Sequence, residues 1–354
     1  MTKRNNGPQQ IGSLITDDLL GRIEQMREQS QRRRIEGEAR PGESWDEAAA
    51  RLRKEQPAPS SNVRKPPPGD AQPDFFVPTL YDVGTKDSRS IMDVAVFRLS
   101  KKDRRAGEVI HYTLPDGHVT VSAGAAGMAS VWDYDLVLMA VSHLTEAMNR
   151  YREGKGEKPG RVFRPHVADV LKFCRRADGG KQKDDLVETC IRLNTTHVAV
   201  QRTRKAKNGR TVTVSEGEAL ISRYKVIKSE SGKPEYIEIE LADWMFREIT
   251  EGKNPDVLTV HPDYFLIDPG IGRFVYRLAR RAAGRGQAKW AFQTIYERSG
   301  SAGTFKEFCR ILRKIIEAND LPEYRLTEEP GQAGPLLVMS HRHYEEPSLP
   351  PPGV

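Results

Sequence analysis

Residues 268–341 read DPGIGRFVYRLARRAAGRGQAKWAFQTIYERSGSAGTFKEFCRILRKIIEANDLPEYRLTEEPGQAGPLLVMSH, and this stretch decides the fold. Asp268-Pro269 predicts a helix start, because a capping side chain precedes a proline at the first helical position. The apolar residues from Ile271 to Ala282 keep to one helical face, and Gly284 ends the run. A second helix is expected from Gln287 to Arg298, ahead of a glycine-rich turn at 299–303.

A third helix with a basic face follows that turn. Thr304 and Glu307 have the spacing of a capping box. The inner face of the helix is apolar, and its outer face carries Lys306, Arg310, Arg313 and Lys314. Two strand-like pieces, 324–326 and 336–339, flank a turn at 330–334. Helix, helix, turn, basic helix and hairpin in this order predict a winged helix-turn-helix.

Positive charge is concentrated in this segment. Between residues 270 and 325 there are twelve basic and five acidic residues, an excess equal to the net charge of +7 of the whole chain. A local excess of this kind supplies the phosphate-neutralising part of duplex binding. The alternative is a solvated basic face on an ordinary helical domain. The order of turn, capping box and hairpin favours a DNA-reading helix over that alternative.

The same order of elements occurs earlier in the chain. Strand-like pieces at 92–99, 109–113 and 118–121 precede three helices. These helices begin near Asp133 or Asp135, near Pro165 and after Gly179-Gly180, and a hairpin of 197–203 and 211–213 follows them. The predicted fold class is therefore α+β, with two tandem winged helix-turn-helix domains and a disordered N-terminal arm. The two copies share no obvious residue-level repeat.

The earlier copy carries its basic residues in the hairpin rather than on its third helix. On that helix Asp184, Asp185 and Glu188 oppose Lys181, Lys183 and Arg192. The basic hairpin residues are Arg202, Arg204, Lys205, Lys207 and Arg210. We expect this copy to serve dimerisation or partner binding and to contact phosphates through the hairpin, which positions DNA without reading bases. A hairpin that is only a solvated loop is the alternative.

Length and composition suggest the domain boundaries. A chain of 354 residues, with 30% charged and 37% hydrophobic residues, has room for two domains and disordered tails. We expect residues 1–72 to be a disordered arm and proline-rich linker with short helices, one of them opened by a capping box at Ser44 and Glu47. The first winged-helix domain is expected at 73–255, the second at 256–341 and a disordered tail at 342–354.

The sequence lacks the signatures of several other protein classes. No apolar run approaches the roughly 18 to 20 residues of a membrane span, and the first residues contain no apolar signal core, so a cytoplasmic location is expected. Cys174, Cys190 and Cys309 are far apart, which favours buried thiols over a zinc site. No phosphate-binding loop with its lysine occurs. No metal and no other cofactor is therefore expected.

Several short residue strings are similar to those of a known protein family. They are Asp74-Phe75-Phe76-Val77, Ser90-Ile91-Met92, 129–138 (ASVWDYDLVL), Ser142-His143-Leu144, Gly179-Gly180, Arg192-Leu193-Asn194, 276–280 (YRLAR), Gly300-Ser301 and Leu321-Pro322. In this order, from about residue 73 to 341, the chain resembles the replication initiator protein A family of plasmids. The resemblance does not cover the N-terminal arm.

The resemblance implies a specific function. Such initiators are tandem winged-helix proteins that bind direct repeats in the double-stranded DNA of a plasmid origin and help to melt the adjacent AT-rich DNA. They bring in the host replication initiator and the replicative helicase, and the first winged helix contributes dimerisation, so a homodimer is expected. The resemblance places base reading on Lys306, Arg310, Arg313 and Lys314, since Arg or Lys against guanine is the commonest direct contact. Phosphates would be positioned by Arg285, Lys289, Ser301, Thr304 and Arg325.

A strand-cleaving enzyme is one rival interpretation. Rolling-circle initiators and relaxases combine a His-hydrophobic-His metal motif with a tyrosine, often Tyr-x-x-x-Lys. This chain has Tyr151 followed four residues later by Lys155, and it has His341-Arg342-His343. The order of the two motifs is reversed, and the residue between the histidines is charged. We therefore expect no catalytic residues and no enzymatic activity.

Two alternative functions also involve DNA binding. A winged-helix transcriptional repressor would use the same major-groove helix, so the sequence does not separate it from an initiator. Single-stranded DNA binding would use aromatic residues among basic ones, such as Phe274, Tyr276 and Trp290. Aromatic residues in such positions are more often part of a core, and we favour that interpretation.

Overall fold

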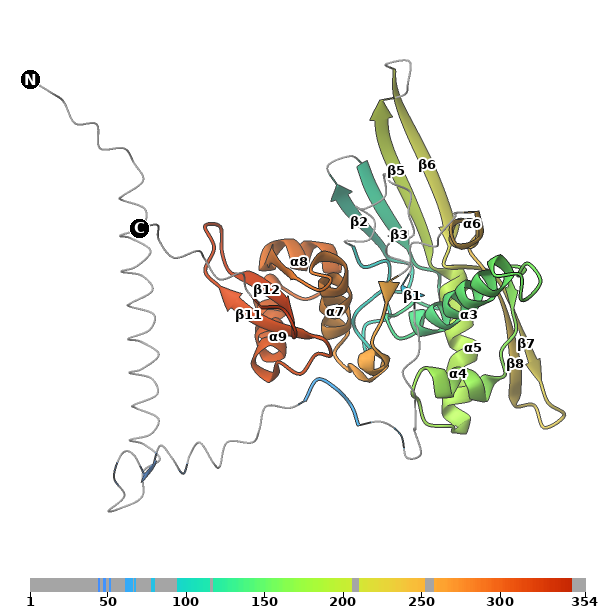
Figure 1. Cartoon of the computed structure of the whole chain (residues 1–354), viewed down its shortest axis with the longest axis horizontal. Coiled ribbons are helices and arrows are strands. Elements are labelled where there is room, and N and C mark those ends of the chain that lie inside the picture. The colour runs from blue at the N-terminus through green and yellow to red at the C-terminus, as the bar shows by residue number, and fades with distance from the viewer. Residues whose placement is uncertain are drawn as a thin grey trace, which may run out of the picture. The chain divides into compact units, whose positions relative to one another are not determined.

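A computed structural model of the chain describes residues 44, 47–48, 51, 61–65, 67, 78–79, 94–114, 117–205, 210–251 and 258–345 (Figure 1). The chain divides into two units, Met1–Ser60 and Ser61–Val354. In the first unit the capping box is present: the Ser44 amide donates to the Glu47 carboxylate at 3.0 Å, and the Glu47 amide donates to the Ser44 hydroxyl at 3.4 Å. Most of the expected arm and linker and most of the expected tail lie outside the described residues.

Three helices in the second unit confirm the pattern of the earlier copy. They are α3 (Tyr134–Arg152), α4 (Val167–Phe173) and α5 (Gly180–Thr195). Their apolar faces, including Leu136, Leu171 and Leu193, are buried. Gly179 is the N-cap residue of α5, so the glycine pair separates α4 from α5 as predicted.

The first sheet contains the strand-like pieces predicted at 109–113 and 118–121 and the hairpin predicted at 197–203 and 211–213. It is antiparallel, with the strand order β2 (Val109–Leu114), β3 (Gly117–Ser122), β5 (His197–Lys205) and β6 (Thr211–Ala219). Strands β5 and β6 are longer than predicted and project beyond the neighbouring elements (Figure 1).

A second sheet and a helix were not predicted. Strands β4 (Val162–Phe163), β8 (Pro234–Leu241) and β7 (Ile221–Lys228) form the sheet, and α6 (Asp243–Glu251) follows. In β8 the buried Ile237, Ile239 and Leu241 alternate with glutamates, so period-two alternation would have revealed this strand. A separate short pair joins β1 (Pro78–Thr79) to β9 (Leu258–Thr259).

The C-terminal segment, residues 258–341, has the order helix, strand, helix, helix, strand, strand. After the short 3-10 helix η3 (Pro262–Leu266), it contains α7 (Gly270–Ala282), β10 (Gln287–Ala291), α8 (Phe292–Ser299), α9 (Phe305–Ala318), β11 (Tyr324–Glu329) and β12 (Leu336–His341). The three strands form one antiparallel sheet in the order β10-β12-β11. The helices pack beside this sheet (Figure 1).

The helix predicted from Gln287 to Arg298 is wrong over its first five residues, which form β10. Ala288 and Trp290 pack against the core, whereas Lys289 between them is exposed. This alternation suits a strand, and pairing with β12 satisfies the backbone. Because β12 lies some fifty residues later, as the pairing of Ala288 with Met339 shows, local sequence did not reveal the partner.

Two further local predictions are wrong. Among residues 94–99 of the strand expected at 92–99, only Arg98 makes a bridge, to Ser130, while Phe97 is fully buried in irregular chain. Helix α7 begins one residue later than predicted, with Pro269 as its N-cap and no capping side chain. The Asp268 carboxylate instead forms an ion pair with Lys101.

Part of the expected linker packs against the C-terminal segment. The Ser61 hydroxyl and the Asn62 amide donate to the Asp320 carboxylate at 2.7 Å and 2.6 Å. The backbone amide of Arg64 donates to the carbonyl of Leu266 at 2.8 Å. Residues 61–65 are therefore part of the folded unit and not of an extended linker.

Buried contacts of α7 join the C-terminal segment to the preceding helices and strands. Arg273 of α7 is 1% exposed and donates to Asp135 of α3, which is fully buried, at 2.7 Å. Arg277, one turn later, lies over the rings of Phe97 and Tyr134 at 5.1 Å and 4.7 Å. A Cβ atom on Gly270 would lie 2.1 Å from the carbonyl oxygen of Leu99, so only glycine allows this approach of α7.

Asp133 gives the fold a predictable acid sensitivity. Burial alone would raise the pKa of this carboxyl, but hydrogen bonds and the charge of Arg192 outweigh it, and the pKa lies below its usual value. Its oxygens accept from Arg192 at 2.8 Å and 2.9 Å, from Thr189 at 2.7 Å and from Ser130 at 2.7 Å. A carboxyl with a depressed folded-state pKa contributes stability above its unfolded pKa of about 4, and this is lost as the pH falls through the folded pKa.

We therefore expect the unfolding free energy to fall below about pH 4, and Asp133→Asn to flatten this acid limb while lowering stability at neutral pH. Urea unfolding between neutral and acid pH measures both effects. Asp184→Asn, on the exposed side of α5, is the control and should leave the acid limb as it is. An unchanged acid limb in Asp133→Asn would show that other carboxyls govern it.

Candidate nucleic-acid interface

The outer face of α9 brings the four predicted base-reading residues together. Lys306, Arg310, Arg313 and Lys314 are all exposed, whereas Phe308, Leu312 and Ile315 on the inner face are buried. The Thr304 hydroxyl caps the helix by accepting from the Glu307 amide at 3.3 Å. The Glu307 side chain does not complete the predicted capping box, because it accepts a hydrogen bond from Arg310 instead.

The turn before α9 is held from both sides. Gly300 ends α8 with a φ of 57°, and a Cβ atom there would lie 2.3 Å from the Tyr112 hydroxyl of β2. The Tyr296 hydroxyl donates to the carbonyl of Gly303 at 2.8 Å. Ser301 is half-buried in this turn, and Thr304 is exposed at its end. The start of α9 is therefore fixed by packing on the first sheet.

Carboxylates pair with several of the basic residues. Arg310 donates to Glu307 of the same helix at 2.6 Å and 2.8 Å. Arg313 donates to both oxygens of Glu328 on β11, at 2.8 Å and 2.9 Å. The hydrogen bond from Arg310 holds the pKa of Glu307 below its usual value, and the bond to Glu328 raises the pKa of Arg313.

The predicted phosphate-binding residues are more dispersed. Lys289 of β10 is paired with Glu329 of β11 at 2.6 Å. Arg285, Arg325, Lys306 and Lys314 are exposed and form no ion pair with any residue in the described part of the chain. Arg285 lies between α7 and β10, and Arg325 lies on β11. Arg325 and the outer face of α9 thus belong to elements that meet at the Arg313–Glu328 pair.

Not all of the basic residues in the C-terminal segment lie at the surface. Arg273 and Arg277 are 1% and 3% exposed and point into the core, so they add nothing to a DNA-binding face. The sequence could not show this, because both residues lie in an amphipathic pattern that places arginines on the polar side. The basic face predicted for α9 is present, whereas Arg273 and Arg277 of α7 add to the charge count without adding to a basic surface.

The structure describes the side chains of only some of the basic residues of the β5–β6 hairpin. Arg202 is half-buried on β5. Arg204 and Lys205 also belong to β5, but their side chains lie outside the described residues, as does all of Lys207. The phosphate-binding role predicted for this hairpin therefore remains a prediction.

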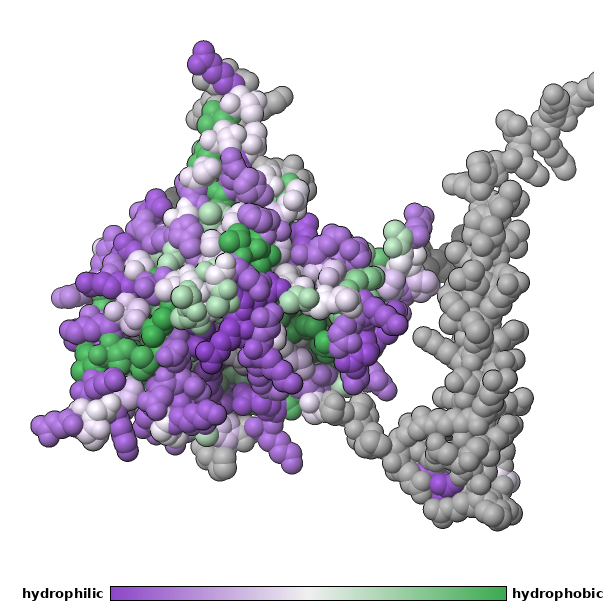
Figure 2. Space-filling view, turned by 180° about the vertical axis from the view of Figure 1, so that it is seen from behind, coloured by the Kyte–Doolittle hydropathy of each residue, from purple (hydrophilic) through white to green (hydrophobic). Residues whose placement is uncertain are grey.

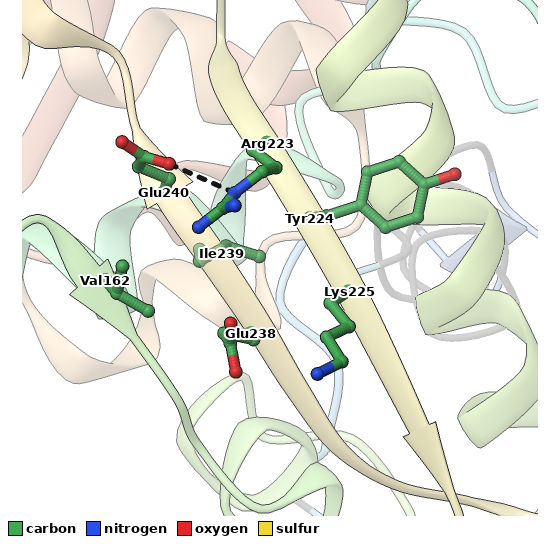
Figure 3. Close-up of a pocket in the computed structure, with 7 residues that line it drawn as sticks. All are labelled: Val162, Arg223, Tyr224, Lys225, Glu238, Ile239 and Glu240. Carbon is green, nitrogen blue, oxygen red and sulfur yellow. Dashed lines mark ion pairs between the residues drawn. The ribbon is translucent and has the colours of Figure 1, made fainter.

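A shallow depression lies on the second sheet rather than near α9 (Figure 3). Val162, Arg223, Tyr224, Lys225, Glu238, Ile239 and Glu240 line it. Arg223 and Glu240 pair across β7 and β8 at 3.2 Å. Glu238 is also paired, to Arg164 at 2.5 Å. Such cross-strand pairs stabilise a sheet surface.

Figure 2 shows one face of the molecule covered mainly by hydrophilic residues, with separate apolar patches between them. Among the described residues, no three His, Cys, Asp or Glu side chains form a group that could hold a metal ion, and no helix is long and apolar enough to cross a membrane. Cys174, Cys190 and Cys309 are buried thiols, as predicted, and burial raises the pKa of Cys174 to about 12.

The aromatic residues considered for single-stranded DNA binding lie mostly in the core. Phe274 and Tyr276 are 2% and 0% exposed. Trp290 is partly buried, and Arg298 lies over its ring at 5.3 Å. Phe274 and Tyr276 are therefore not available to stack on bases, and the interpretation of these two as core residues is confirmed.

Comparison with known proteins gives matches of three kinds. The family model described as Replication initiator protein A matches residues 86–326. A protein of Wigglesworthia glossinidia brevipalpis named "Putative replication protein" is 25% identical over 238 residues, which cover 66% of this chain and 82% of that protein. Two crystal structures of domains 2 and 3 of RctB superpose with a TM-score of 0.45 at 13% identity, covering 70% and 71% of this chain and 96% of each RctB chain. A structural likeness at that score carries no argument of its own.

Proposed function

Since this chain belongs to the replication initiator protein A family, we propose that it is a plasmid replication initiator that binds repeated sites in double-stranded origin DNA. The observation that carries the proposal is the outer face of α9, where Lys306, Arg310, Arg313 and Lys314 are exposed together. A major groove about 12 Å wide admits one α-helix, and Arg or Lys is the usual partner of guanine there.

The C-terminal segment is proposed to act as a winged helix. Its order of α7, β10, α8, α9, β11 and β12 supports this, with α9 as the reading helix and the β11–β12 hairpin as the wing. Phosphate contacts would come from exposed groups around α9, namely Arg285, Lys289, Ser301, Thr304 and Arg325. Such contacts fix the register of the protein on the duplex.

The segment before it is proposed to be a first winged helix that serves homodimerisation. Helices α3, α4 and α5 followed by the β5–β6 hairpin support this assignment. Phosphate contacts would come from the hairpin residues Arg202, Arg204, Lys205 and Lys207. The sheet that contains this hairpin also packs on the turn before α9. The hairpin and α9 would therefore contact the same duplex at a fixed distance from each other.

The proposed initiator works without catalysis or a cofactor of its own. It would act in the cytoplasm, help to melt AT-rich DNA beside its binding sites and bring in the host replication initiator and replicative helicase. The lack of a phosphate-binding loop in the sequence supports a division of labour in which the recruited helicase hydrolyses ATP.

A duplex-binding titration tests the proposal. Repeats from upstream of the gene are compared with shuffled duplex at several salt concentrations, because phosphate contacts alone give salt-sensitive binding on any sequence. We expect tight binding to the repeats and much weaker binding to the shuffled duplex. Equal, weak binding to both would contradict sequence reading by α9.

A transcriptional repressor would give the same titration result, so a second measurement separates the two functions. Permanganate modifies unpaired thymines, and we expect it to detect melted AT-rich DNA next to the repeats when the protein is bound. Tight repeat binding without any permanganate reactivity would favour repression over initiation.

A further inference from the structure

The basic residues around α9 differ in whether they have acidic partners. Arg310 pairs with Glu307, Arg313 with Glu328, and Lys289 with Glu329. The carboxylates come from α9 and from β11, so two different elements direct acids at the same basic surface. Lys306 and Lys314, at the two ends of the face, form no ion pair with a described residue.

The Arg313–Glu328 pair joins α9 to β11. The two side chains meet in a forked, two-point contact, with distances of 2.8 Å and 2.9 Å. The Arg313 guanidinium also lies over the ring of Phe292 at 5.6 Å. Glu328 is 33% exposed, so it is held at the surface where DNA would approach. The guanidinium is thus held in one position before any DNA arrives.

These pairs affect phosphates and bases differently. An exposed ion pair contributes little to stability, so breaking it is not a large barrier. A phosphate that approaches Arg313, however, also approaches the negative Glu328 and is repelled by it. A base edge carries no net charge, and a carboxylate can itself accept a hydrogen bond from the cytosine amino group.

We propose that Glu307, Glu328 and Glu329 are specificity determinants that suppress sequence-independent binding of duplex DNA at the α9 face. This inference rests on the proposed function and deepens it. Glu307 and Glu328 reduce the attraction of their arginine partners for phosphates, and Glu329 does the same for Lys289. The arginines remain able to form hydrogen bonds with bases. Binding then depends on the base sequence, while Lys306 and Lys314 supply the residual phosphate attraction.

The variant Glu328→Gln tests this inference, with a short duplex of shuffled sequence as the probe. Glutamine keeps the shape of the side chain and removes its charge. We expect affinity for the shuffled duplex to rise by up to about tenfold at about 0.1 M salt, and the salt slope to steepen by about 0.9, the value of one added phosphate contact. Affinity for the repeats should rise less, so the specificity ratio falls.

Glu317→Gln is the matched control. Glu317 is exposed on α9, and no ion pair joins it to any described residue, so its substitution removes the same charge from the same helix without releasing an arginine. If both variants bind shuffled duplex equally, the effect is one of net charge and the inference is overturned. An unchanged salt slope in Glu328→Gln overturns it as well.

The double variant Lys306→Ala/Lys314→Ala separates this inference from the proposed function. If it weakens binding while Glu328→Gln changes nothing, α9 binds DNA but its carboxylates do not discriminate. If the double variant binds both repeats and shuffled duplex as the unmodified protein does, the DNA-binding face lies elsewhere, and the proposed role of α9 fails together with the inference.

Discussion

Replacing Arg310 and Arg313 together by alanine is expected to lower affinity for the repeats by about 2–6 kcal/mol, which corresponds to about 1–3 kcal/mol for each base contact. Both side chains project from the exposed face of α9, about half exposed, where a major groove would receive them. Binding to shuffled duplex should change far less, because the carboxylate partners already neutralise these arginines in the unbound protein.

Titration of both duplexes at constant salt measures this effect. The fold should survive, since each lost ion pair is exposed and is worth about 0–1 kcal/mol. Lys228→Ala/Lys233→Ala is the charge-matched control, because it removes two exposed lysines from the β7–β8 hairpin. An Arg310/Arg313 variant that still binds the repeats normally would mean that α9 is not the reading helix.

Local pattern was sufficient wherever an element is stabilised by its own neighbours in sequence. Helices α3, α5, α7 and α9 each show a continuous apolar face, and β2 pairs with β3, which follows it directly in the order of strands. The pattern failed at β10, where only pairing with β12 distinguishes a strand from a helix start. It failed again at Phe97, which is buried without regular structure. In both places the deciding contact is remote in sequence.

The candidate interface could be predicted in its position but not in its electrostatics. Spacing alone placed Arg310 and Arg313 on one outer face of α9, since residues three apart share a helix side. The partner of Arg313 lies on β11, fifteen residues later, and no helical or strand periodicity connects the two. Counting charges likewise treated Arg273 as a surface residue, although it is buried against α3. Ion pairs and burial depend on tertiary packing, which sequence patterns do not encode directly.

The buried charges between α7 and α3 explain why the two segments form one unit. Asp135 is fully buried between two arginines, Arg273 at 2.7 Å and Arg176 at 2.9 Å. Arg273 also donates to the backbone carbonyls of Ile267 and Phe265, at 2.7 Å and 2.6 Å. Each group is satisfied only if both segments are in place. A buried network of this kind specifies one relative placement, which the proposed function with two DNA-contacting elements requires.

Asp135→Asn is therefore expected to lower the unfolding free energy by about 3–5 kcal/mol, because it leaves the buried Arg273 guanidinium and the partly buried Arg176 guanidinium without their shared counter-charge. Urea unfolding of the full chain measures the loss. The control Asp184→Asn, on the exposed side of α5, should change stability by no more than about 0.5 kcal/mol. Since Asp135 is the charged link between α3 and α7, we also expect the variant to unfold in two separate steps if the unmodified unit unfolds in one. A loss below about 1 kcal/mol with a single transition would show that apolar packing, including Arg277 over Phe97 and Tyr134, joins the two segments without this network.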